Sequence, residues 1–80
     1  MSARRENASL KMRMLATALE HLAIAFGLMD TASKIPLNGV HLPAEDSIYE
    51  ISKAMESVRH SVVSLAMLIE EERKREEERR

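Results

Sequence analysis

The sequence predicts an all-α protein, an antiparallel hairpin of two long helices. Two apolar ladders predict this fold, one on each side of a break that contains both prolines. Each ladder steps by three and four residues, a spacing that keeps one stripe of side chains facing one neighbouring helix. The first ladder contains Met12, Leu15, Leu19, Leu22, Phe26 and Met29, and the second contains Ile48, Ile51, Met55, Val58, Val62, Leu65 and Ile69.

Length and composition favour a single helical domain that self-associates. A chain of 80 residues is near the size below which a monomer buries too little apolar surface for stability. The chain has no cysteine to form a stabilising disulfide, and its histidines are not spaced for a structural metal. We therefore expect oligomerisation to supply the missing burial.

The first helix is expected over about residues 8–30, after a polar opening segment that could fray. A connection follows over about residues 31–43, where Pro36, Asn38-Gly39 and Pro43 interrupt the periodicity. This connection is unusually apolar for a loop. We expect it to fold back over the end of the helices and cover it through Ile35, Leu37, Val40 and Leu42.

The second helix is expected over about residues 44–72. Pro43 suits a first helical turn, and Glu45 and Asp46 place negative charge at the positive end of the helix dipole. A charged helical tail follows over about residues 70–80. We interpret it as a solvated helix end that frays, in preference to a spacer or a partner-binding arm.

Charge placement also predicts the antiparallel pairing. If Met29 lies opposite Ile48, Arg4 and Arg5 fall beside the acidic turn at residues 70–72. Exposed ion pairs contribute only about 0–1 kcal/mol each, so they set orientation more than stability.

The first helix carries a second apolar stripe on its far side, here called the outer row. A helix that is apolar almost all round is normally buried on more than one side, and one partner helix cannot cover it. We expect a homodimer, a four-helix bundle with the first helix central. There are two alternatives: the loop covers the outer row, or a different protein docks on it. The outer row contains Leu10, Met14, Thr17, His21, Ile24 and Leu28.

No residue pattern predicts catalysis, a cofactor or a metal site. The chain lacks a Gly-rich phosphate loop and the common hydrolase and zinc motifs. Glu20, His21, Glu56 and His60 fall at one height of the hairpin, and Glu56 and His60 are one turn apart. Their positions point outward, so we interpret them as solvated surface residues. We expect no enzyme activity.

Nucleic-acid binding is the alternative function, because helical-hairpin dimers can bind phosphates through basic residues. The candidates are few and bunched at one end, and the chain has almost no aromatic platform for bases. They are Arg4, Arg5, Lys11, Arg13 and Lys34.

Membrane attachment is not expected, because the longest apolar stretch, Leu22 to Met29, is far shorter than the ~20 residues that cross a bilayer. No signal peptide is apparent, and the lack of cysteine fits the cytoplasm.

The sequence therefore favours a small cytoplasmic regulator without enzymatic activity. It would bind another protein, for example a transcriptional regulator, through an apolar helix face and inhibit or titrate it. An 80-residue chain without catalytic groups acts by occupying a surface.

Overall fold

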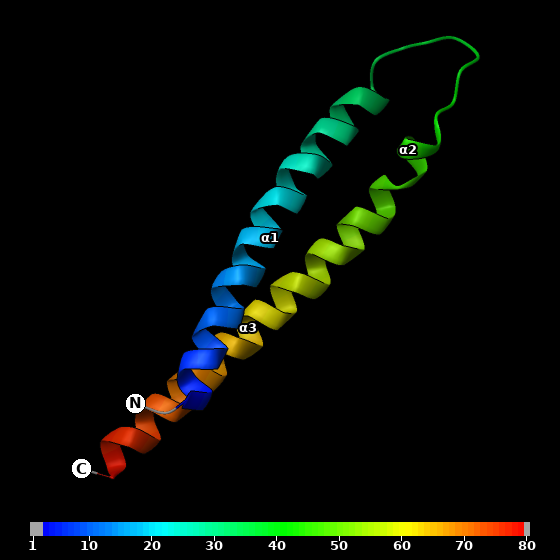
Figure 1. The fold of residues 1–80 in the computed structure, drawn as a ribbon. Helices are drawn as coiled ribbons and strands as arrows, with labels where there is room; N and C mark the ends of the chain where they lie inside the picture. The colour runs from blue at the N-terminus through cyan, green and yellow to red at the C-terminus, as the bar shows by residue number, and fades with distance from the viewer. Residues whose placement is uncertain (1–2, 80) are drawn as a thin grey trace.

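The chain folds as a helical hairpin. The computed structural model describes residues 3–79, so the first two residues and the last residue of the expected domain lie outside the described part. Its elements are α1 (Ala3–Ser33), α2 (Pro43–Asp46) and α3 (Ile48–Glu78). Helices α1 and α3 run antiparallel, with both chain ends at one end of the molecule and the loop at the other (Figure 1). The Cα atoms span 68 × 14 × 14 Å, a narrow rod.

The contact between α1 and α3 follows the two ladders. Every ladder residue is half-buried, whereas the residues between them on each helix are mostly exposed. Side chains spaced by three and four residues form one stripe on a helix, and two such stripes meet in the hairpin. Among the described residues only Ala8 and Glu72 are buried rather than half-buried or exposed, and no large side chain is fully buried. The hairpin by itself therefore has a thin core.

Helix α1 begins earlier than expected, at Ala3 rather than near residue 8, and it ends at Ser33 rather than near residue 30. Two arginines fasten its first turn to the end of α3. Arg4 Nε lies 3.4 Å from Glu72 Oε1, and Arg5 forms an ion pair with Glu76. These contacts hold the polar opening segment against α3, where the polarity of the sequence had suggested fraying.

The charged tail continues α3 as regular helix to Glu78. Ion pairs along the helix accompany it: Arg73 contacts both Glu70 and Glu77, and Arg75 Nη1 lies 3.3 Å from Glu72 Oε1. Oppositely charged residues three and four apart support a helix that has little apolar contact. The tail is thus helical to Glu78, as expected, and its fraying stays a prediction.

The second helix starts in two steps. Pro43 opens the single turn of α2, as its missing N–H allows. The chain bends at Ser47, whose N–H donates to the carbonyl of Ala44, and α3 then starts with the N–H of Ile51 donating to the carbonyl of Ser47. The expected start near residue 44 therefore corresponds to α2, and the long helix itself starts at Ile48.

The loop does not cover the end of the hairpin, contrary to the expectation from its composition. Its chain arches away from the helix ends (Figure 1). Gly39 has a positive φ of 77°, which suits glycine in a tight turn, and the N–H of Val40 donates to the carbonyl of Leu37. The loop lines a shallow hollow there, together with Ala32 near the end of α1 and Glu45 of α2. Four apolar side chains remain exposed in it: Ile35, Leu37, Val40 and Leu42.

Candidate interaction surface

The outer row lies on the side of α1 that faces away from α3. All six of its residues are exposed, while the ladder residues of the same helix are half-buried. Exposed fractions are 51% for Leu10, 64% for Met14 and Ile24, and 67% for Leu28. An apolar stripe of this length on an exposed helix face is typical of a surface that another helix covers.

The two polar residues of the outer row use the backbone of their own helix. Thr17 Oγ1 donates to the carbonyl of Arg13 at 3.0 Å, and His21 Nδ1 lies 2.8 Å from the carbonyl oxygen of Thr17. A carbonyl oxygen only accepts, so Nδ1 of His21 carries the proton and donates it. With these bonds made, Thr17 and His21 interrupt the apolar stripe less than their polarity suggests.

The outside of α3 is polar by comparison. Lys53 and Tyr49 pair there, with the ammonium nitrogen 4.7 Å from the centre of the ring. Val63 and Met67 are the exposed large apolar residues farther along this helix, and they lie four residues apart. They form a small patch rather than a stripe.

The four titratable residues expected at one height of the hairpin are all exposed: Glu20, His21, Glu56 and His60. Glu56 and His60 line a shallow open hollow together with Arg59 and Val63, all on α3. Within residues 3–79, no group of three or more His, Asp or Glu side chains is placed to hold a metal ion.

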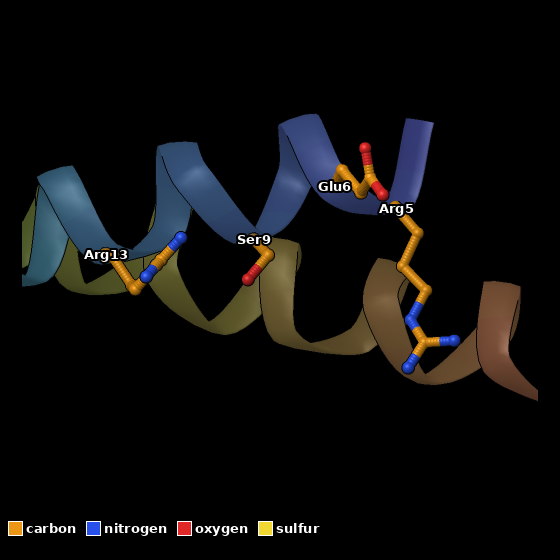
Figure 2. A pocket seen from close by; sticks show the side chains of 4 residues that line it. All are labelled: Arg5, Glu6, Ser9 and Arg13. Carbon is orange, nitrogen blue, oxygen red and sulfur yellow. The ribbon is translucent and has the colours of Figure 1, made fainter. Parts of the chain in front are cut away.

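Two of the basic residues near the chain start, Arg4 and Arg5, lie against carboxylates of α3. Figure 2 shows Arg5 extending over the ribbon of α3, while Glu6, Ser9 and Arg13 line the same shallow hollow from α1. Arg4 and Arg5 are paired with Glu72 and Glu76. These carboxylates neutralise positive charge that would otherwise attract phosphates.

Lys34, at the other end of α1, is also paired with a carboxylate. Its ammonium nitrogen lies 3.0 Å from Asp30 Oδ2. The candidate basic residues thus lie at two ends of a long rod and form no continuous basic strip along it.

By length and composition alone, α1 could cross a membrane. The uninterrupted apolar stretch is still Leu22 to Met29, because Glu20 and His21 precede it, and the absence of membrane attachment stays a prediction. The property is a weak indication, because core helices of soluble proteins and signal sequences share it. Glu20 and His21 lie near the middle of α1, where ionisable side chains are costly in lipid. The same apolarity suits a helix packed between other helices.

No protein-family model matches the chain, and searches among curated proteins and solved structures found no significant match.

Ala8 was not singled out from the sequence, and Glu72 was expected only in the acidic turn beside Arg4 and Arg5, not as a buried residue. Ala8 is 4% exposed and Glu72 is 9% exposed. Both continue the spacing of the ladders: Ala8 lies four residues before Met12, and Glu72 lies three residues after Ile69. Extending the spacing through small and charged residues would have found them.

Proposed function

We propose that this protein is a non-enzymatic regulator that acts by binding another protein through the outer row of α1. In the absence of that partner, the outer row pairs with a second copy, giving a four-helix bundle with the two α1 helices at its centre. The exposure of four large apolar side chains along one face of α1 carries this proposal.

Burial of apolar surface supplies the driving force. Each large apolar side chain taken fully out of water contributes about 1.5–3 kcal/mol of stabilising free energy. The thin hairpin core leaves the large side chains of the outer row exposed, so their burial can still stabilise an association. Soluble monomers seldom expose long apolar stripes, and such stripes rimmed by polar residues mark interaction sites.

Exchange between the two partners provides the regulation. A protein that presents a complementary amphipathic helix competes with the second copy for the outer row. Because both complexes use one face, binding of the target removes the homodimer, and excess protein titrates the target. A transcriptional regulator in the cytoplasm with an exposed apolar helix is one such target.

The test is a double substitution in the outer row, Ile24→Glu with Leu28→Glu. We expect the wild-type protein to sediment as a dimer and its Tm to rise with protein concentration, since a dimer is stabilised by mass action. The variant should sediment as a monomer with a Tm independent of concentration.

The matched control is Val63→Glu with Met67→Glu on α3. These residues are also exposed, apolar and four apart, with exposed fractions of 52% and 62%. The control should remain dimeric. Equal sedimentation of the wild type and both variants would refute self-association through the outer row.

Binding of a target is tested separately, by capture with the wild type and with both variants in nuclease-treated extract. The proposal requires one protein that the wild type and the α3 control retain at high salt and the outer-row variant loses. A parallel capture from extract without nuclease tests the alternative function, which retention of nucleic acid that falls steeply with salt would support.

A further inference from the structure

The outer row is self-complementary when it is read in opposite directions. Its residues are separated by steps of four, three, four, three and four, a series that is the same from either end. Residues 10 and 28, 14 and 24, and 17 and 21 lie equally far from residue 19. The chemistry follows the same symmetry, because the two central residues are polar and the two at each end are apolar.

We infer that the outer row binds the outer row of a second copy running antiparallel, with the two-fold axis at the level of Leu19. This inference rests on the proposed homodimer and specifies its register. Leu10 then packs on Leu28 of the other copy, and Met14 packs on Ile24. A two-fold axis generates each contact twice. The dimer contact then has two apolar layers on each side of a polar centre.

The polar centre pairs unlike groups. Since His21 donates from Nδ1 to the carbonyl of Thr17, its Nε2 in the neutral ring is an acceptor directed away from that bond. In the antiparallel register it faces the hydroxyl of Thr17 in the other copy, which can turn to donate to it. A parallel dimer would instead place two imidazole acceptors opposite each other.

Charges beside the outer row favour this register at its ends and oppose it at its centre. Four charged residues lie along one flank at seven-residue intervals, interrupted by Gly27: they are Glu6, Arg13, Glu20 and Lys34. The antiparallel pairing brings Glu6 beside Lys34 of the other copy, an attractive contact that occurs twice. At the axis the two Glu20 carboxylates approach each other and repel, and the nearest arginine, Arg13, is more than a turn away on either side.

The other flank permits close approach. Ala18, Ala25 and Ala32 follow one another there at seven-residue intervals. Small side chains beside a contact reduce the distance between helix axes. The outer row also extends along α1 from Leu10 to Leu28, as far as the ladder that packs on α3 extends from Met12 to Met29. A second copy therefore finds a row as long as this ladder, although the hairpin contact itself continues beyond the ladder to Ala8.

Cysteine cross-linking tests the register, because the chain has no cysteine of its own. Leu10→Cys and Leu28→Cys variants are made separately, one with a size tag, and are mixed and oxidised. We expect the mixed disulfide to exceed either like-with-like disulfide at least tenfold. In the antiparallel dimer the two copies of residue 28 are about 27 Å apart, from a rise of 1.5 Å per residue, so Leu28→Cys alone should not cross-link.

The outcomes separate this inference from the proposed function. Rapid cross-linking of Leu28→Cys with itself would indicate a parallel dimer and overturn the register while leaving self-association intact. A sedimenting dimer that forms neither disulfide would also overturn it. A monomer would overturn both the register and the homodimer, while capture of a target through the outer row remains separately measurable. The α3 variant Val63→Cys, mixed with Leu28→Cys, is the control for random collision.

Discussion

The two long helices have the same length, yet their outer faces differ. Both contain 31 residues and both give one ladder to the hairpin. Away from that contact, α1 exposes the outer row, in which four of six residues are large and apolar, whereas α3 exposes mainly charged and hydroxyl side chains. A hairpin requires one apolar face on each helix. The second face of α1 is therefore not explained by the hairpin itself, and it is the part of the molecule that suggests function.

The largest expected effect comes from breaking the feature that the two helices share. Leu19→Asp places a carboxylate in the ladder contact, where an unpaired charge loses much of its hydration. We expect a loss of at least ~2 kcal/mol in the free energy of unfolding and loss of most helical signal in circular dichroism. His60→Asp puts the same carboxylate on the exposed face of α3 and should change stability by less than about 0.5 kcal/mol. Equal effects of the two substitutions would mean that the ladders do not form the contact.

The hairpin itself could be predicted from the sequence because its determinants repeat. Spacing by three and four residues identifies both long helices, and the charges at Arg4 and Arg5 identify the end of α3 that they meet. The same regularity shows that α1 has an outer row. These features depend on periodicity, which a local reading of the chain reveals.

The helix ends and the loop could not be predicted in the same way. Helix already at Ala3 is not expected from the sequence, although the pairing of Arg4 and Arg5 with the end of α3 is, because the polarity of the opening segment favours fraying over that pairing. The loop is apolar, and apolarity alone suggests burial. In the structure its four large apolar side chains are instead half or more exposed, in a loop that turns at Gly39 with a positive φ. Composition alone does not give the path of a loop between two helices.

A smaller effect is expected from making the outer row of α1 uniformly apolar, which sharpens its contrast with α3. Thr17→Val with His21→Leu removes the polar centre. More apolar area is then buried, so we expect the dimer to bind about tenfold more tightly in sedimentation. A polar layer also fixes register and orientation at a cost in stability. The same change should therefore let Leu28→Cys cross-link with itself beside the mixed disulfide with Leu10→Cys. Unchanged affinity and unchanged cross-linking would show that Thr17 and His21 lie outside the contact.

The smallest effect concerns the charged end of α3, where ion pairs replace apolar contact. A hydrogen bond from Arg73 lowers the pKa of Glu70 below its ordinary value, with the positive charge of Arg73 and Lys74 adding to the effect. A carboxylate whose pKa is lowered in the folded state stabilises that state above its unfolded pKa. This contribution is lost as the pH falls through the lowered pKa. Because both side chains are exposed, we expect only local fraying of the last turns at acid pH, seen as faster amide exchange there.

Arg73→Gln should raise the pKa of Glu70 toward its ordinary value in an NMR titration. Lys53→Gln, on the same helix but distant from Glu70, should leave that pKa unchanged, and an equal shift in both variants would assign it to net charge instead.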